Sequence, residues 1–328
     1  MQQETRETMG LFAKLRRHAA VATGNFAAMF QKVEIPPLPA AVSRLVAEAN
    51  KPEPDFDVLA ELISSTTGLA AKVIQTVNSP LYGLQRPVTN VRQAVTFLGI
   101  RNIRSLALAY ATMSALPSPR DSLFDEEAFW ADSLLHALLA RALCAKRFQG
   151  SAEDAFTAGL LAHVALPVLL TVWGDYYRPI VSRWGEASVR LSALERGHFG
   201  WDHAQAGAWI VQYWEFPEEL VCYIGAHNLD LDDLERYELQ ETVALPLAVA
   251  ALAPSLLKTD PERIRAFRES ACRRLGLDPA TLAARLEEVK DSFHALMGLF
   301  GLQVRGAEPY FQALETAQEA VEEVGHAC

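Results

Sequence analysis

The side chains best suited to chemistry in this sequence are histidines set in apolar, helix-like stretches. His163 lies in GLLAHVALPVLL, His203 in WDHAQAG and His227 in GAHN. Imidazole is a common ligand of divalent metal ions, and such an ion can activate water and neutralise the charge of a phosphate. A lone histidine on a helix, however, commonly braces the fold through hydrogen bonds. Residue types alone therefore leave a metal site and a structural role open.

The cysteines offer no competing chemistry. They are widely spaced, form no Cys-x-x-Cys pair, and are Cys144, Cys222, Cys272 and Cys328. This spacing predicts neither a zinc knuckle nor a disulfide framework, and it fits a reducing compartment.

Charge and hydropathy limit the partners. Half of the 328 residues are hydrophobic, the formal net charge is -10, and the pI is about 5.4. The negative charge argues against non-specific nucleic-acid binding. The N-terminus has no apolar signal segment, and the uncharged run 155–174 contains His163 and Pro167, so we interpret that run as a buried helix rather than a membrane span. We expect a cytoplasmic protein without a membrane partner.

Helical periodicity dominates the elements that must position the histidines. No segment shows a sustained period-two alternation flanked by hairpin turns. Asp55 or Asp57 can cap one early helix, and Asn90 with Gln93 has the spacing of a capping box. The motif PSPRD, at 117–121, is the best internal boundary.

The chain is therefore predicted to be all-α and to have four parts. A helical leader occupies residues 1–33, and a first helical half follows at 34–120. A second helical half occupies 121–245, and a helical extension occupies 246–328.

Charge is unevenly distributed along the chain. Residues 62–120 contain no Asp or Glu, and their basic residues are Lys72, Arg86, Arg92, Arg101, Arg104 and Arg120. Acidic residues crowd a later segment and are Asp230, Asp232, Asp233, Glu235, Glu238 and Glu241. Both sets can be ordinary solvated faces, or complementary surfaces for a partner or for another part of the chain.

Several separated motifs follow one another at close spacing. They are IPPLPAAVSRLVAEAN, ELISSTTGLAAKVIQTVNSPLYG, VRQAVTFLGIRNIRSLAL, FWADS, GLLAH and ERGHFGWDHAQAGAWIVQYWEFPEELVCYIGAHN. Over about residues 34–245 the chain resembles the HDOD domain, a bacterial signalling module. The resemblance implies an N-terminal helical subdomain packed on a degenerate subdomain related to HD phosphohydrolases and HD-GYP cyclic-di-GMP phosphodiesterases. It also implies a regulatory role, generally without hydrolytic activity.

The resemblance locates the positions at which HD enzymes hold metal ions. Their metal-binding helix reads GLLHDIG, and its adjacent His and Asp supply two ligands. The matching residues are Ala162 and His163, followed by Val164, so neither register restores the pair. A late aspartate is expected near VALPLAVAA, which has no acidic residue. Without a bridging aspartate, two neighbouring ions would repel each other with too little compensation.

The other ligand positions are partly retained. Asp132 stands where the family's first histidine is expected, and His136 follows one helical turn later. His203 and His227 match HD-GYP ligands, but Asn228 follows His227 instead of a second histidine. A single ion held by the three histidines and Asp132 stays open beside the structural interpretation. The other prominent residues of this stretch are expected to pack the fold, and they are Glu195, His198, Trp201, Gly207, Trp214 and Pro217.

We therefore expect no catalytic residue, no metal ligand and no cofactor. The favoured function is a non-catalytic bacterial signalling module that binds a regulatory protein partner or a small ligand, with the groove between the two halves as the binding place. One alternative is a metal-dependent phosphohydrolase acting on a nucleotide or a cyclic dinucleotide. The other is a DNA-binding regulator with a helix–turn–helix at 57–78. Only four of its residues could reach DNA, namely Lys72, Gln75, Thr76 and Asn78.

Overall fold

The structure is a computed structural model. It describes residues 35–66, 68–144, 148, 151–186, 189–256, 258–300, 302 and 306–315. These residues form helices, turns and loops without a strand, which confirms the all-α prediction. The predicted leader at 1–33 lies outside the described residues.

The N-terminal half forms a lobe of short helices. They are α2 (Ala40–Ala49), α3 (Phe56–Ser65), α4 (Leu69–Val77), the 3-10 turn η2 (Pro80–Tyr82), α5 (Val91–Leu98) and α6 (Ile100–Ala115). Asp55 caps α3 by accepting a 2.8 Å hydrogen bond from the backbone of Asp57. Asn90 caps α5 by accepting from Gln93, whose own amide oxygen accepts from Thr89 instead of closing a capping box.

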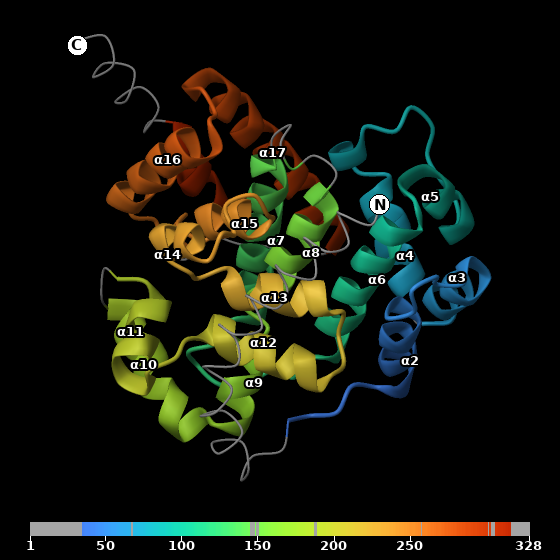
Figure 1. The fold of residues 1–328 in the computed structure, drawn as a ribbon, viewed down its shortest axis with the longest axis horizontal. Helices are drawn as coiled ribbons and strands as arrows, with labels where there is room; N and C mark the ends of the chain where they lie inside the picture. The colour runs from blue at the N-terminus through green and yellow to red at the C-terminus, as the bar shows by residue number, and fades with distance from the viewer. Residues whose placement is uncertain are drawn as a thin grey trace.

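The remainder of the chain contributes longer helices around one core. They are α7 (Glu126–Leu143), α8 (Ala152–Leu161), α9 (Ala165–Val172), α10 (Gly174–Glu186), α11 (Leu191–Phe199), α12 (His203–Tyr213), α13 (Glu218–Ala226), α14 (Leu231–Arg236), α15 (Ala244–Ala250), α16 (Pro261–Leu275) and α17 (Pro279–Phe300). Residues 307–315 are also helical. The α7–α8 pair lies at the centre, with α15 and α17 against α7 (Figure 1).

The apolar run 155–174 was predicted as a single buried helix, and the structure corrects this in one respect. Residues 162–164 form a turn, so α8 ends at Leu161 and α9 begins at Ala165. Pro167 has no N–H to donate back to His163, which removes one of the bonds that would continue the helix. The segment Ala152–Val172 is long and apolar enough to span a membrane by composition, but 78% of its most apolar window is buried inside the protein. Its burial confirms the core-helix interpretation.

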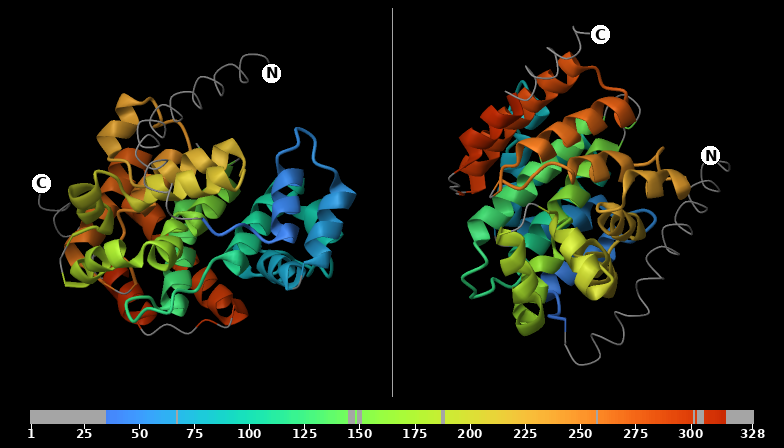
Figure 2. Two further views of the ribbon diagram at one scale, coloured as in Figure 1. Left: turned by 90° about the horizontal axis from the view of Figure 1, so that it is seen from below. Right: turned by 90° about the vertical axis from the view of Figure 1, so that its left-hand side faces the viewer.

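The two halves adjoin through several helices rather than a tether. Figure 2 shows the N-terminal helices as a lobe beside the larger helical body, with α6 packed on α8. The guanidinium of Arg101 lies 2.7 Å from the Asp154 carboxylate, so one ion pair joins a basic residue of the first half to an acidic residue of the second. Trp214 donates from Nε1 to the backbone oxygen of Pro36 at 3.0 Å.

The division of the chain into four parts stays a prediction, but one of its boundaries falls within a helix. Position 245 lies inside α15, which is buried along its whole length and packs on α7, α8 and α13. The C-terminal extension therefore shares its core with the second half.

The central α7–α8 contact depends on a glycine. A Cβ atom on Gly159 would lie 2.8 Å from Ala137 Cα, 3.1 Å from Ala137 N and 3.2 Å from the His136 carbonyl oxygen. Backbone atoms of a packed helix cannot move aside as a flexible side chain can. The two helices approach this closely because residue 159 has no side chain.

We expect Gly159→Ala to lower the free energy of unfolding by about 2 kcal/mol, because it overpacks the α7–α8 contact. Gly185 is a matched control, since it is also helical but has open space around its added Cβ. Gly185→Ala should leave stability unchanged or raise it by about 0.5 kcal/mol. Urea unfolding measures both, and equal stability in the two variants would contradict the packing argument.

Candidate functional site

Four histidines from separate elements converge beside α7. His136 lies on α7, His163 in the α8–α9 turn, His203 at the start of α12, and His227 at the end of α13. One nitrogen from each of His163, His203 and His227 lies within 4.8 Å of the others, and the rings of these three are 5.1–5.3 Å apart between centroids. Asp132, His136 and His163 form a second such group. The structure thus brings together every candidate ligand inferred from the sequence.

Local structure fixes the position of His203. Asp202 caps α12 by accepting from two backbone N–H groups, and the Gln205 side chain accepts from the backbone of Asp202, which completes a capping box. Gly207 lies one turn later, where an added Cβ would be 3.2 Å from Ile224 and 3.3 Å from Val164. The predicted role of Gly207 in helix approach is therefore confirmed.

A buried carboxylate beneath His203 was missed as part of the site. Glu195 on α11 is fully buried and accepts hydrogen bonds from His203 Nδ1 at 2.6 Å and from the His203 backbone at 3.0 Å. It also accepts from the hydroxyl of Tyr177. The sequence interpretation gave Glu195 only a packing role, although an acidic residue predicted to face a core needs a polar partner.

The other nitrogen of His203 also has partners. Arg190 donates from Nη2 to Asn228 Oδ1 at 2.7 Å, so the amide nitrogen of Asn228 faces His203 Nε2 at 3.0 Å. Because an amide nitrogen only donates, Nε2 is the acceptor. His163 Nδ1 lies 3.1 Å from the same atom and is therefore a second donor. This pattern keeps the His203 imidazole neutral, because Nε2 must retain its lone pair to accept.

Opposed influences act on the charge of His203. Burial lowers its pKa, but the adjacent Glu195 carboxylate raises it more, and the net shift is upward. The amide donor from Asn228 works against the charged form, since it needs the lone pair on Nε2. The hydrogen bonds as they stand favour the neutral ring.

His227 is held at only one of its nitrogens. Nδ1 donates to the backbone oxygen of Ile224 at 2.7 Å, while Nε2 is buried without a hydrogen-bond partner. Burial lowers the pKa of His227 well below its usual value, and the neighbouring His203 lowers it further. His163 behaves in the same way, with burial as the main cause and the other histidines adding to it. Both rings are neutral at pH 7.

Asp132 and His136 complete the edge of the cluster. Asp132 Oδ1 accepts from the backbone of Leu256 at 2.8 Å, and His136 Nδ1 donates to the Asp132 backbone oxygen at 3.0 Å. The contact between His136 Nδ1 and Asp132 Oδ2 is 3.9 Å, which is too long for a hydrogen bond. Asp132 thus ties α7 to the segment after α15.

The donor set fits one metal ion and not two. Three imidazole nitrogens within 4.8 Å match the nitrogen ligands that zinc prefers, and the orphaned His227 Nε2 is available as a ligand. Binding would require an ion to displace the donors of His163 and Asn228 from His203 Nε2. Residues 243–250 are apolar and buried, so they supply no carboxylate to bridge a second ion.

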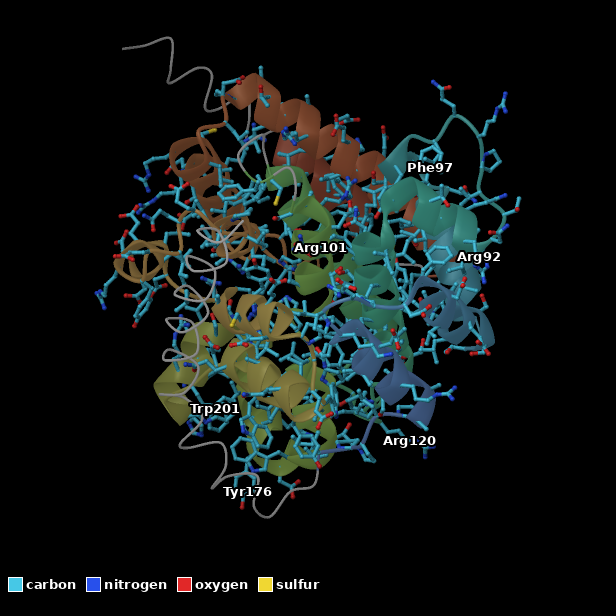
Figure 3. All side chains as sticks on the ribbon, turned by 45° about the vertical axis from the view of Figure 1, so that its right-hand side comes forward. Arg92, Phe97, Arg101, Arg120, Tyr176 and Trp201 are labelled. Atoms are coloured by element: carbon cyan, nitrogen blue, oxygen red, sulfur yellow. The ribbon has the colours of Figure 1, made fainter. Side chains whose placement is uncertain are left out.

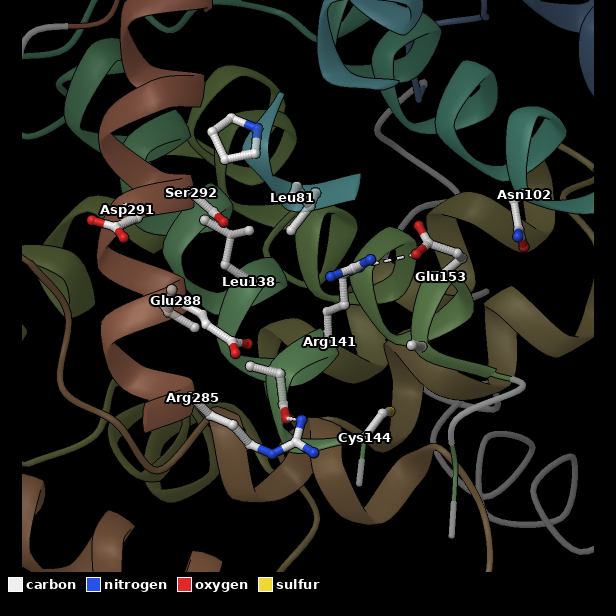
Figure 4. Close-up of a pocket in the computed structure, with 14 residues that line it drawn as sticks. Leu81, Asn102, Leu138, Arg141, Cys144, Glu153, Arg285, Glu288, Asp291 and Ser292 are labelled. Atoms are coloured by element: carbon white, nitrogen blue, oxygen red, sulfur yellow. Dashed lines mark hydrogen bonds and ion pairs between the residues drawn. The ribbon is translucent and has the colours of Figure 1, made fainter. Parts of the chain in front are cut away.

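A larger cavity lies elsewhere, between the N-terminal lobe and α17. Its volume is about 740 Å³, and it is lined by η2, α6, α7, α8 and α17 (Figure 4). Arg141 Nε donates to Glu153 at 2.9 Å, and the Tyr82 hydroxyl donates to the same carboxylate at 2.6 Å. Arg285 donates to the backbone oxygen of Ala142. These charged groups are therefore largely occupied by contacts within the chain.

The predicted helix–turn–helix engages two of its four polar residues within the lobe, although Gln75 is exposed. α4 packs on α5 and α6, and Thr76 is buried with its hydroxyl 2.8 Å from that of Tyr110. The Asn78 side chain makes two 2.8 Å hydrogen bonds with the backbone of Val88. Two of the four residues proposed to reach DNA are thus engaged inside the lobe.

The basic residues of this lobe also do not gather in one patch. Arg92, Arg101 and Arg120 lie apart from one another in Figure 3. Arg92 pairs with Asp57, and Arg101 pairs with Asp154. The acid-free stretch of sequence is therefore partly neutralised by acids from other segments.

His227 should make stability depend on pH. The folded state keeps its imidazole neutral, while the unfolded chain protonates it near pH 6.5, so its contribution is present above that pH and is lost as the pH falls. We expect His227→Asn to lose less stability than the wild type between pH 7 and pH 5, by up to about 2 kcal/mol. Urea unfolding at both pH values measures this. The exposed His198→Asn is the control, and the same pH dependence in all three proteins would refute the assignment.

Comparison with known proteins supports the fold and the family. Residues 35–229 match the family model of the HDOD domain. A candidate phosphohydrolase from Shewanella amazonensis SB2B is 26% identical, with 83% of this chain and 98% of that chain covered and a TM-score of 0.66. An HDOD domain protein of unknown function from Geobacter sulfurreducens is 21% identical, with 90% and 96% covered and a TM-score of 0.57.

A curated relative extends this comparison to a longer protein. An uncharacterized protein of Treponema pallidum (strain Nichols) is 24% identical over 196 residues. The match covers 60% of this chain and 38% of that protein, so this chain corresponds to less than half of the relative's length. The family match over residues 35–229 agrees with the motifs that suggested it from the sequence. The chain belongs to the HDOD domain family.

Proposed function

We propose that the protein is a non-catalytic signal-transduction module that acts by binding a regulatory protein or a small ligand. The observation that carries the proposal is the replacement of the metal-binding His–Asp pair. Ala162 and Val164, both buried, flank His163, and neither can ligate an ion. Phosphoester hydrolysis by this kind of site requires an ion that activates water. A site whose carboxylates, Asp132 and Glu195, are engaged by hydrogen bonds within the protein, as is the imidazole of His203, is poorly equipped for it.

The arrangement of the two halves supports a binding role. They share an interface that includes the α6–α8 contact and the ion pair between Arg101 and Asp154. The cavity of about 740 Å³ at this junction is of the size that holds a small ligand or a partner's side chains. It is lined by both halves and by α17, so a bound molecule would contact three regions at once. Binding there would couple occupancy to the relative position of the halves.

One observation favours a second candidate, a metal-dependent phosphohydrolase. His163, His203 and His227 still converge on one point, and His227 Nε2 is left without a partner. One of the similar structures also carries the description of a candidate phosphohydrolase. A single ion at this point would need water as a further ligand to be catalytic.

Hydrolysis assays distinguish the two functions. We expect the purified chain with Mn²⁺ or Fe²⁺ to hydrolyse nucleotides and cyclic di-GMP no faster than the metal alone. The reason is that residues 243–250 supply no carboxylate to bridge a second ion. An active HD-type phosphodiesterase assayed in parallel is the positive control. Turnover that disappears in His203→Ala would overturn the non-catalytic proposal.

DNA binding is expected to be absent at physiological salt. Thr76 and Asn78 form hydrogen bonds within the lobe, and Arg92 and Arg101 pair with carboxylates. We expect no mobility shift of duplex DNA at 150 mM salt, since specific recognition needs free phosphate and base contacts. A salt-dependent shift that is lost on replacing Arg86, Arg92 and Arg101 would contradict this expectation.

A further inference from the structure

A small cavity adjoins the histidine cluster, where α7, α10, α11 and α16 meet. Its volume is about 80 Å³. The lining residues that matter here are Asp132, His163, Trp184, Arg190, Ser192 and Arg263. A space of this size holds a group of a few heavy atoms, whereas sites for drug-sized molecules are several times larger.

Two arginines of this cavity have no carboxylate partner. Arg190 donates from Nη2 to the neutral amide of Asn228, and Arg263 donates from Nη2 to two backbone oxygens at 3.1 and 3.3 Å. Neither forms an ion pair with any carboxylate in the described part of the chain. In contrast, the adjacent Arg196 pairs with Asp202 at 2.6 Å. Buried charges are normally paired, so two unpaired guanidinium groups facing one cavity are unusual.

The guanidinium groups remain charged at neutral pH. Burial lowers the pKa of Arg190 to about 10, with a contribution from the nearby Arg263 and Arg196. Burial also lowers the pKa of Arg263, while Asp260 acts to raise it. Both shifts indicate cations held in a partly dehydrated place, a situation that a bound anion would relieve.

Two uncharged donors at the same cavity also lack acceptors. The Ser192 side chain is almost fully buried, at 1% exposure, and its Oγ has no hydrogen-bond partner. The indole Nε1 of Trp184 is buried and has none either. Buried donors without partners are rare in proteins, and an indole N–H can only donate. Both residues line the cavity, so a side-chain rotation would bring each donor to an acceptor bound there.

One carboxylate has to be weighed against these donors. Asp132 lines the cavity, and its Oδ1 is engaged by the backbone of Leu256. The lining imidazoles of His163 and His203 add no charge, because burial keeps His163 neutral and the hydrogen bonds to Nε2 keep His203 neutral. With two guanidinium groups and one carboxylate, the charged lining has a net excess of one positive charge.

We propose that this cavity binds a tetrahedral oxyanion, either inorganic phosphate or the phosphoryl end of a small phosphate monoester. Donors reach it from α10, from the start of α11 and from α16, so an occupant must offer acceptors in several directions. A carboxylate has two oxygens, whereas a phosphate or phosphoryl group has three or four and pairs well with arginine. The inference rests on the proposed function, to which it adds a phosphate-bearing ligand bound beside the histidine cluster, apart from the larger cavity between the halves.

Phosphate binding to the full chain tests this directly. Calorimetric titration and thermal unfolding are done without added metal, with sodium chloride adjusted to keep ionic strength constant. We expect saturable binding and a rise in Tm of about 5 °C at a phosphate concentration 100 times the Kd. Ser192→Ala should weaken binding about 10-fold, and Arg190→Gln about 10- to 100-fold. Glycerol phosphate in place of phosphate distinguishes a monoester ligand from the free ion.

Two variants outside the cavity serve as matched controls. Thr157→Val removes another buried hydroxyl that lacks a partner, and Arg104→Gln removes another arginine that donates to a backbone oxygen. Both should bind phosphate as the wild type does. Ser192→Ala keeps the test valid even where Arg190→Gln does not fold, because removing an unpaired hydroxyl costs little stability.

The outcomes separate this inference from the proposed function. No phosphate binding, or equal binding in the wild type, Ser192→Ala and Arg190→Gln, overturns the anion site and leaves the non-catalytic proposal standing. Phosphate binding together with metal-dependent hydrolysis leaves the anion site standing and overturns the non-catalytic proposal.

Discussion

The buried carboxylate of Glu195 is the group on which the arrangement of the histidines depends. It accepts from the side chain and the backbone of His203 and from the hydroxyl of Tyr177, so one charge fixes α10, α11 and the start of α12 relative to one another. A buried carboxylate is tolerated only when hydrogen bonds replace its water. Those bonds set the tautomer of His203, because Nδ1 carries the proton that Glu195 accepts. Nε2 is thereby left to accept from the centre of the cluster.

The rest of the cluster follows from that orientation. With Nε2 of His203 as an acceptor, the neighbouring groups must be donors, and His163 and Asn228 supply them at 3.1 and 3.0 Å. Asn228 can do so because Arg190 holds its amide oxygen on the other side. The Nε2 lone pair of His203, which could bind a metal ion, is thus used within the protein, whereas that of His227 is not. Hydrogen bonds to His203 in the place of a metal ion explain how a site can lack the His–Asp pair and still keep its histidines buried.

Much of this could be predicted from the sequence, and the exceptions share a cause. Helical periodicity and the cap at Asp55 are local properties, and the HDOD motifs occur in order, so fold class and family followed from them. The break after Leu161 was missed because an apolar run gives no sign of a turn unless the effect of Pro167 is counted. Glu195 was assigned to packing because its partners lie on other helices, and sequence spacing does not report such contacts. For the same reason the sequence left open whether the charge-rich stretches are solvated faces or complementary surfaces, and it did not show that Arg92 pairs within its own lobe.

The cavity beside the histidine cluster is lined by positive charge although the metal-binding His–Asp pair is replaced. In an enzyme of this superfamily, metal ions would supply both the positive charge that holds a phosphate and the activated water that cleaves it. Here positive charge at the cavity comes from Arg190 and Arg263, and guanidinium groups bind oxyanions without lowering the pKa of a water molecule as an ion does. A site built in this way can keep affinity for a phosphate while losing the means to hydrolyse its ester. Such a separation of binding from cleavage is what a module that senses a phosphorylated ligand, rather than consuming it, requires.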